Sequence, residues 1–425
     1  MSYGGFTKDS GSTHVFRHHQ SHRKTNAIKS VLDRVGPVNC DDSVSALLPG
    51  GFIRRNLPLR SMHRSKLMPE DHRSSSKLNS TLRTCQPELK QRLPNKNIQK
   101  KGCRYWLLGN CVRGDKCHYL HSLFSGKGLS MLVQLKGHQK AVRGIALPSG
   151  SEKLYTCSKD GLLQSWDCHT GQCADANNLG CEIGSSVSAG PWVFVGMLNA
   201  IKVFNIDTNA EYYLTGLVGL IYAMTVERDV LFAGAQDGTI YAWKFNPESN
   251  SFQGPALLKG HQGAVVSLVV GANRLYSGSM DHNIKVWDID TLQCIQTLNR
   301  HSAVVMSLLL WNQHLFSCSL DNTIKVWATS EDCNMEVIYT HNEEDGVLAL
   351  CGAIDAEAKP VLLCSCNDNS IHLYDLPSFS QRGRIYATQE IRSIHIGSGG
   401  LLFTGDEAGL VTVWKWVSES GSQAS

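Results

Sequence analysis

A strand-like segment that ends in an aromatic residue recurs seven times between residues 131 and 416, at intervals of 38 to 47 residues. The seven aromatic residues are Trp166, Phe204, Trp243, Trp287, Trp327, Tyr374 and Trp414. Five of the repeats carry an aspartate six residues earlier, namely Asp160, Asp237, Asp281, Asp321 and Asp368. A period near forty residues with four short strands per repeat is typical of the β-propeller, in which each repeat forms one blade. The sequence therefore predicts an all-β fold with seven blades.

Histidines open four of the repeats and complete a recurring polar pattern. Because buried polar atoms need partners, we expect one hydrogen-bonded network inside each such blade. The predicted members are His138, Asp160 and Trp166; His261, Asp281 and Trp287; His301, Asp321 and Trp327; and His341 with Asp368. Thr156, Ser277 and Ser317 are candidate fourth members. Hydrolases also use Ser, His and Asp, but here the set recurs per blade and no motif places a serine at a nucleophile turn, so we expect no enzyme.

The dipeptides Trp166-Asp167 and Trp287-Asp288 resemble the signature of the WD-repeat family, which implies a WD40 propeller. The last blade ends with its third strand, Val413–Trp416, and Met131–Leu135 lies where an outer strand would be expected. Joining these two segments would remove both free sheet edges and close the ring. We expect the ten cysteines of this region, Cys364 and Cys366 among them, to be small buried apolar side chains rather than ligands of a second metal.

The most specific chemical motif lies in residues 101–122, where Cys103, Cys111, Cys117 and His121 follow the spacing Cys-x7-Cys-x5-Cys-x3-His. Three thiolates and one imidazole can close a tetrahedral site around Zn²⁺ and leave no open position for a substrate. Such a short segment has no core of its own, so metal binding would supply folding free energy on the order of 10 kcal/mol. His118 could compete as a ligand, but the spacing favours His121. We therefore predict one structural zinc ion.

This motif resembles the CCCH zinc-finger family, whose fingers bind single-stranded RNA through backbone groups and stacked aromatic rings. The resemblance implies that Trp106 and Tyr119 stack on bases, beside Tyr105. It implies that the basic side chains Arg104, Arg113 and Lys116 contact phosphates or base edges. Family fingers that bind AU-rich RNA often carry a second stacking aromatic residue two positions after the second cysteine. This chain has Arg113 at that position. The alternative interpretation is that Trp106 and Tyr119 pack around the metal without contacting a ligand.

The charges are divided unequally along the chain, although its net charge is only +4. Residues 1–128 hold 23 Lys and Arg against 8 Asp and Glu, whereas residues 129–425 hold 18 against 29. Residues 1–100 lack a sustained hydrophobic period and are predicted to be disordered, as is the tail 417–425. The basic run Arg54, Arg55, Arg60, Arg64 and Lys66 would suit a nuclear-localisation or nucleic-acid patch, or only a solvated segment. We therefore assign nucleic-acid binding to the N-terminal part and a protein partner to the acidic propeller.

Composition excludes other classes. No apolar run is long enough to span a membrane, and the first residues lack a signal-peptide core, so we expect no membrane partner. Fifteen cysteines without a secretory signal favour a reducing compartment, the nucleus or the cytoplasm, and we favour the nucleus. We also expect no small-molecule substrate. The segment Ser122–Ser130 would tether the finger to the blade that holds both chain ends.

One CCCH finger followed by seven WD-type repeats resembles the plant zinc-finger CCCH/WD-repeat family over residues 101–416. The favoured function is an adaptor that binds RNA, with DNA as the variant. The lack of a ββα pattern in the finger favours single strands. The alternative is a scaffold or ubiquitin-ligase substrate receptor with a purely structural finger. Receptors of the cullin-4 type usually carry arginine two residues after the Trp-Asp pair, where this chain has His169 and Asp290.

Overall fold

The computed structural model describes residues 101–330 and 334–418, which belong to one compact unit of the chain. The region 1–100, with its basic run, and residues 419–425 lie outside the described residues, so the predictions of disorder there stay predictions. No helix in the described part is long and apolar enough to cross a lipid bilayer. The described cysteines are all free of disulfide bonds.

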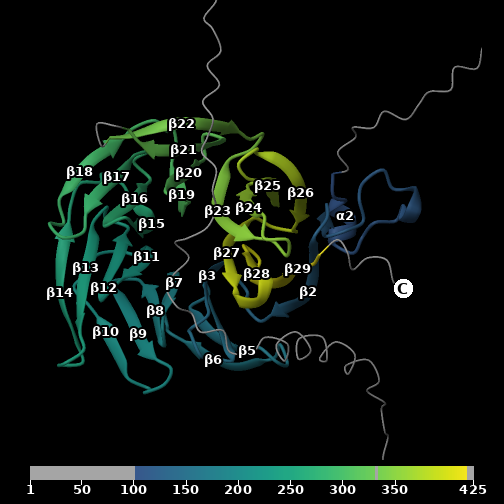
Figure 1. Cartoon of the computed structure of the whole chain (residues 1–425). Helices are drawn as coiled ribbons and strands as arrows, with labels where there is room; N and C mark the ends of the chain where they lie inside the picture. Colours follow the sequence, from purple (N-terminus) through teal and green to yellow (C-terminus); the bar gives the residue numbers. More distant parts are fainter. Residues whose placement is uncertain (1–100, 331–333, 419–425) are drawn as a thin grey trace, which may run out of the picture. The chain divides into compact units, whose positions relative to one another are not determined.

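Seven antiparallel sheets surround a common axis and form the predicted seven-bladed propeller (Figure 1). Blade 1 contains β3 (Val142–Ala146), β4 (Lys153–Ser158), β5 (Leu162–Asp167) and β6 (Cys173–Asn178). Blade 2 contains β7 (Ile183–Ala189), β8 (Trp192–Met197), β9 (Ala200–Asn205) and β10 (Glu211–Leu214). Blade 3 contains β11 (Ile221–Glu227), β12 (Val230–Ala235), β13 (Ile240–Asn246) and β14 (Ser251–Leu258).

The remaining four blades repeat this arrangement. Blade 4 contains β15 (Val265–Gly271), β16 (Arg274–Ser279), β17 (Ile284–Asp288) and β18 (Cys294–Leu298). Blade 5 contains β19 (Val305–Trp311), β20 (His314–Ser319), β21 (Thr323–Thr329) and β22 (Met335–Asn342). Blade 6 contains β23 (Val347–Ile354), β24 (Pro360–Cys366), β25 (Ser370–Asp375) and β26 (Ser380–Tyr386). Blade 7 contains β27 (Ile391–Gly397), β28 (Leu401–Asp406) and β29 (Leu410–Trp416), completed by β2 (Leu129–Lys136).

The ring closes as predicted, because β2 from the start of the propeller pairs with β29 from its end. Met131 lies opposite Trp414 and Leu135 opposite Val411. Figure 1 shows this junction as blue β2 beside yellow β29. The first strands of successive blades contact one another all the way round, including β27 with β3. Closure removes free edges from the junction, which protects it against pairing with other chains.

The core lies between neighbouring blades, where side chains from two sheets interdigitate. One cluster joins Phe232 and Ile240 of blade 3 to Val265 and Trp287 of blade 4. The central strands are apolar over most of their length because both of their faces are covered. The outer strands β6 and β18 are mostly exposed, and their sequences are correspondingly polar.

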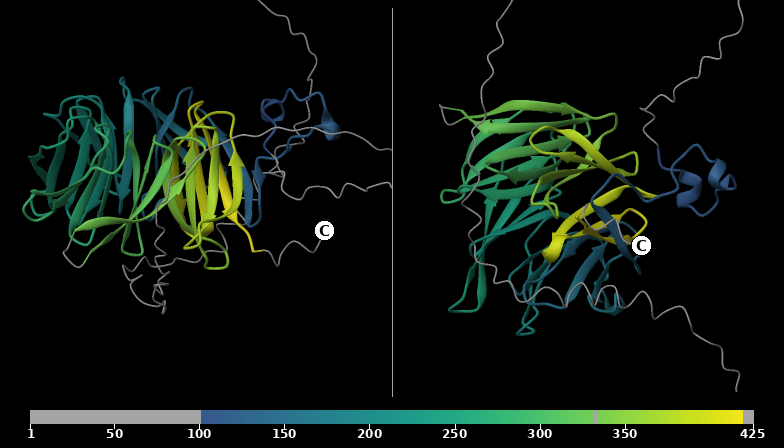
Figure 2. Two further views of the ribbon diagram at one scale, coloured as in Figure 1. Left: turned by 90° about the horizontal axis from the view of Figure 1, so that it is seen from above. Right: turned by 45° about the vertical axis from the view of Figure 1, so that its right-hand side comes forward.

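The finger precedes the propeller and contains little regular structure: α2 (Arg104–Leu107), the 3-10 turn η1 (Gly114–Lys116) and a bridge between Gly102 and Leu120. After it, β1 (Phe124–Ser125) adds a fifth strand to blade 6 by pairing with Ile385 and Arg384 of β26. Figure 2 shows the finger, in blue, on the outside of the ring beside the yellow blades. The predicted tether Ser122–Ser130 therefore contacts blade 6 before it reaches blade 7.

Candidate metal centre and nucleic-acid interface

The four predicted metal ligands converge in the finger. The ligand atoms of Cys103, Cys111, Cys117 and His121 all lie within 4.8 Å of one another. The Cys103 and Cys117 sulfurs are 3.7 Å apart. Two sulfurs bound at ~2.3 Å to one tetrahedral zinc ion would be about 3.8 Å apart. The structure thus positions these side chains to bind a metal ion, and their spacing suits zinc.

The local backbone explains why the four side chains meet. Cys103 precedes α2 and is 3% exposed, and its N–H donates to the Leu120 carbonyl, which brings both ends of the finger together. Gly109 and Gly114 adopt φ values of 75° and 49°, so the chain turns sharply on either side of Cys111. The sequence is therefore folded around the ligands by turns, with no apolar core.

One buried atom supports metal binding independently of the spacing. His121 Nε2 is buried and has no hydrogen-bond partner among the described residues. An unpaired buried imidazole nitrogen is costly, and a metal bond would satisfy it. The donor set, three thiolates and one imidazole, is that of structural zinc sites. The residues present therefore fit the predicted ion.

The residues predicted to contact nucleic acid are all exposed in the structure: Arg104, Tyr105, Trp106, Arg113, Lys116 and Tyr119. Tyr105 is 70% exposed and Tyr119 is 52% exposed, which leaves both rings open to a ligand. Trp106 is 36% exposed and stacks on His121, with ring centroids 5.7 Å apart and planes 12° apart. One face of Trp106 therefore packs on a metal ligand, as the alternative interpretation expects, and stacking of this ring on a base stays a prediction.

The finger is fixed to blade 6 by contacts that the sequence did not predict. Tyr386 N donates to the Leu123 carbonyl at 2.8 Å, and Leu123 and Phe124 pack on the apolar cluster of blades 6 and 7. Gly102 lies against the Tyr386 ring so closely that a Cβ would come within 2.7 Å of it. In the sequence, only the adjacent apolar residues Leu123 and Phe124 mark this segment, and two residues are too few to show the hydrophobic periodicity of a strand.

Blades 1, 4 and 5 contain hydrogen-bonded networks at the predicted positions. In blade 5, Trp327 Nε1 donates to Ser317 Oγ at 2.8 Å, and His301 lies 2.7 Å from Ser317 Oγ and 2.8 Å from Asp321. Blade 4 repeats this arrangement with His261, Ser277, Asp281 and Trp287. Blade 1 uses His138, Thr156, Asp160 and Trp166.

The order of donors fixes the tautomer of these histidines. Because an indole N–H only donates, the Ser317 proton goes to His301 Nε2, and Nδ1–H donates to Asp321. Burial lowers the pKa of His301 despite the opposing effect of Asp321. Burial would raise the pKa of Asp321, but the hydrogen bonds from Thr323, His301 and the Ser302 N–H lower it. A neutral imidazole therefore faces an ionised carboxylate.

Blade 6 departs from the predicted network. His341 lies in β22 with its Nε2 3.6 Å from Glu343, rather than pairing with Asp368. Instead His372 Nδ1 bonds to Glu343 at 2.9 Å, and Nε2 lies 3.8 Å from Asp368. No signal in the sequence marked Glu343, because the repeated pattern contains histidines and aspartates but no glutamate. Burial would lower the pKa of His372, but Asp368, Cys366 and Glu343 raise it to about 11.

Blade 7 keeps only part of the network. Trp414 donates to Thr404 Oγ1 at 3.0 Å, and no histidine precedes the blade. Asp406, two residues before Ala408, accepts from the N–H groups of Ala408 and Leu410. Sequence reasoning missed Asp406 because it lies outside the fixed six-residue offset.

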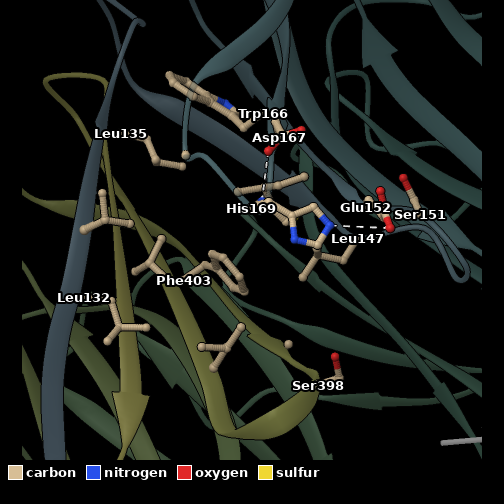
Figure 3. A pocket seen from close by; sticks show the side chains of 17 residues that line it. Leu132, Leu135, Leu147, Ser151, Glu152, Trp166, Asp167, His169, Ser398 and Phe403 are labelled. Carbon is tan, nitrogen blue, oxygen red and sulfur yellow. Dashed lines mark hydrogen bonds and ion pairs between the residues drawn. The ribbon is translucent and has the colours of Figure 1, made fainter. Parts of the chain in front are cut away.

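A pocket between blades 7 and 1 has apolar walls that include Leu132, Leu135 and Phe403 (Figure 3). At its rim His169 pairs with Glu152 at 3.4 Å, and the Ser151 hydroxyl donates to the Lys153 carbonyl. Burial raises the pKa of Cys168, also in the lining, to about 11, so this thiol stays protonated at neutral pH. The polar groups at this rim thus bond to neighbouring groups of blade 1.

Family models match both parts of the chain. One described as "Zinc finger domain" matches residues 103–121, and one described as "WD domain, G-beta repeat" matches residues 129–167, 255–288 and 292–328. The computationally designed Ika8 protein has a similar crystal structure, with a TM-score of 0.51 and 22% identity over 67% of this chain and 99% of that chain. At this identity the likeness concerns the fold alone. Fold and finger together define a scaffold that joins a CCCH zinc finger to a WD40 propeller.

Two plant relatives narrow this class to a family. Zinc finger CCCH domain-containing protein 17 of Oryza sativa subsp. japonica is 58% identical over 330 residues, which cover 78% of this chain and 76% of the relative. Zinc finger CCCH domain-containing protein 48 of Arabidopsis thaliana is 61% identical over 328 residues, 77% of this chain and 76% of the relative. The chain belongs to this plant family of CCCH zinc finger domain-containing proteins with WD repeats.

Proposed function

We propose that this chain is a zinc-dependent adaptor that binds single-stranded RNA through its finger and a protein partner through its propeller. The observation that carries the proposal is the exposure of aromatic and basic side chains in the finger. Tyr105 and Tyr119 lie open to solvent, and so do three cations of the same finger, Arg104, Arg113 and Lys116. Solvent-exposed rings next to positive charge are what binding of single-stranded nucleic acid requires.

The dimensions of the finger favour single strands over duplex DNA. Its helix α2 has four residues, which is too short to lie along a major groove and read base edges. Unpaired bases, in contrast, can stack on Tyr105 and Tyr119 without any helix. RNA is therefore the favoured ligand, and single-stranded DNA is the variant to be compared with it.

One finger supplies only part of the binding free energy. Stacking contributes about 1–3 kcal/mol per base, so two bases alone give micromolar or weaker affinity. The excess of Lys and Arg in residues 1–128 would add phosphate contacts whose strength falls with salt. The acidic remainder of the chain repels polyanions and suits a protein partner.

The test compares full-length wild type with the Tyr105→Ala/Tyr119→Ala double variant in binding to labelled single-stranded RNA. Loss of two stacking surfaces should weaken binding by about 10–100-fold. Tyr213→Ala is the matched control, because Tyr213 is also exposed, at 56%, but lies on the propeller. Zinc content should be the same in all three proteins. Unchanged affinity of the double variant would leave a scaffold whose finger is purely structural.

We also propose that the protein acts in the nucleus, on the basis of its basic N-terminal region. A fluorescent fusion should accumulate there, and replacing Arg54, Arg55, Arg60, Arg64 and Lys66 by glutamine should shift it to the cytoplasm. A fusion whose distribution does not change on this replacement would assign localisation to another segment.

A further inference from the structure

A second group of metal-ligating side chains lies inside blade 6. Glu343 follows β22, Cys366 ends β24, and His372 lies in β25. One ligand atom from each of these residues lies within 4.8 Å of the other two. The side chains are almost fully buried: Glu343 is 4% exposed, His372 is 2% exposed and Cys366 is fully enclosed.

The hydrogen bonds of this cluster are incomplete. Glu343 Oε1 and His372 Nε2 are buried and make no hydrogen bond among the described residues, although they lie 3.6 Å from His341 Nε2 and 3.8 Å from Asp368 Oδ2, respectively. His372 Nδ1 has three neighbours: Glu343 Oε2 at 2.9 Å, Tyr374 Oη at 3.3 Å and Cys366 Sγ at 4.0 Å. Buried polar atoms without hydrogen bonds are rare, and Glu343 Oε1 is the atom of this cluster that an additional bound ion would satisfy.

The charges point to a cation. The buried carboxylate of Glu343 and the partly exposed carboxylate of Asp368 both lie beside one buried imidazole. The positive charge can come from a proton on His372 or from a metal ion that binds in its place. The donors, a thiol, an imidazole and a carboxylate, are the three ligand types of protein-bound zinc.

We propose that blade 6 holds a second zinc ion, bound by Glu343, Cys366 and His372 Nδ1, which reverses the expectation from the sequence that Cys366 is only a small apolar side chain. Asp368 then has the role of an orienting carboxylate, because its Oδ2 lies beside the other ring nitrogen, Nε2, at 3.8 Å. Carboxylates commonly receive the second N–H of a zinc-bound imidazole and fix the ring. Tyr374 Oη lies beside the metal-binding nitrogen and is the nearest further oxygen.

The regular blades support this assignment by contrast. The serine that joins histidine and tryptophan in blades 4 and 5 is Cys364 in blade 6, and the tryptophan is Tyr374. Blade 6 has thus lost the indole donor and the neutral histidine, and has gained Glu343, Cys366 and His372 around one point. The same interior volume is occupied by ligands instead of a hydrogen-bonded chain.

The test is the zinc content of purified full-length protein, measured by mass spectrometry after dialysis. Wild type should hold two ions per chain, and Cys117→Ser, which disrupts the finger, should hold one. Cys366→Ser and Glu343→Gln should each hold one as well. Cys364→Ser is the matched control, because Cys364 is equally buried in the same strand but lies outside the ligand group, and it should keep two.

A second measurement covers a variant that folds poorly. Cys117→Ser protein refolded with Co²⁺ should show a thiolate-to-cobalt charge-transfer band that Cys117→Ser/Cys366→Ala lacks. A wild type with one zinc that is lost in Cys117→Ser overturns the proposal and leaves His372 as a protonated bridge between two carboxylates. Two ions that survive both Cys366→Ser and Glu343→Gln overturn it too, because the second ion then lies elsewhere.

Discussion

Blades 5 and 6 are neighbours with the same strand order, yet they fill the same interior positions with opposite chemistry. Blade 5 has a neutral histidine between a serine and one aspartate, and an indole completes the chain. Blade 6 has a histidine between two carboxylates, with cysteine and tyrosine in the serine and tryptophan positions. The backbone of a blade therefore does not dictate its network. What the fold requires is that the buried polar atoms be satisfied.

His372 shows how the two blades diverge. It lies four residues after Asp368, and blade 5 has Lys325 at the corresponding distance from Asp321. His372 is 2% exposed, whereas Lys325 is only half-buried. A short imidazole can turn inward among carboxylates, but a long ammonium keeps its charge near water. This position on the third strand thus brings a histidine into the interior of blade 6 that the interior of blade 5 lacks.

The largest effect should follow from metal removal. Dialysis of the full-length protein against excess chelator should abolish hydrogen-exchange protection in residues 103–121, because the finger lacks an apolar core. Exchange should also accelerate in β24 and β25 of blade 6 but stay unchanged in β20 and β21 of blade 5. Hydrogen-exchange mass spectrometry measures all three regions in one sample. A response confined to the finger would mean that blade 6 is as independent of metal as blade 5.

The next largest effect should be the loss of stability when the buried indole of blade 5 is removed. Trp327 is 1% exposed, so Trp327→Ala should cost about 3–5 kcal/mol through the cavity it leaves and the loss of a donor to Ser317. The shift in the midpoint of urea unfolding measures this cost. Trp106→Ala in the finger is the control and should leave the propeller transition in place. Tyr374→Ala removes the aromatic residue at the same position of blade 6 and should shift the midpoint less than Trp327→Ala does. A larger shift for Tyr374→Ala would contradict this prediction.

The repeat made most of this architecture predictable. Seven aromatic positions at a nearly constant period predicted seven blades, and an incomplete last blade predicted the pairing of β2 with β29, which the structure confirms. The Cys and His spacing located the four side chains that converge in the finger. These features are predictable because the same local interactions recur in each repeat and leave the same residue pattern in the sequence.

The rest depended on contacts that leave no periodic signal. The strand β1 has two residues and pairs with Ile385, some 260 positions away in the chain, so the sequence offered only a tether. The repeated pattern of histidines predicted that His341 enters the interior of blade 6, whereas in the structure Glu343 contacts the buried His372. When one buried polar residue replaces another, the new side chain still needs a hydrogen-bond partner. A pattern that depends on the residue type, however, no longer detects the position.

A reciprocal exchange tests the comparison at one atom. Ser317→Cys should destabilise blade 5 by about 2 kcal/mol, because a thiol is a poor partner for both Trp327 and His301. Cys364→Ser should cost about 1 kcal/mol, since the new hydroxyl enters a buried site without an indole donor. Urea unfolding of both variants measures the difference. Equal costs would indicate that size alone governs this position.

The smallest effect per residue is the pH dependence of the regular blades. Burial lowers the pKa of His138, His261 and His301 below that of the unfolded chain, which therefore takes up protons first as the pH falls. Their contribution is fully present above about pH 6.5 and is lost as the pH falls from there to their folded-state pKa. Each histidine can change the unfolding free energy by at most about 1.4 kcal/mol per pH unit in that window.

Unfolding midpoints at pH 7.5, 6.5 and 5.5 measure this slope, and His301→Asn should flatten it by removing one of the three titrating groups. His372→Asn tells the two possible states of blade 6 apart. A protonated imidazole holds its proton in both the folded and the unfolded chain near pH 5.5, so its removal changes the slope little there, whereas a metal-bound imidazole holds no proton in the folded chain, so its removal flattens the slope as His301→Asn does. If His301→Asn instead preserves the full slope, the neutral histidine of blade 5 does not titrate on unfolding, and the contrast between the two blades would lie in packing rather than in charge.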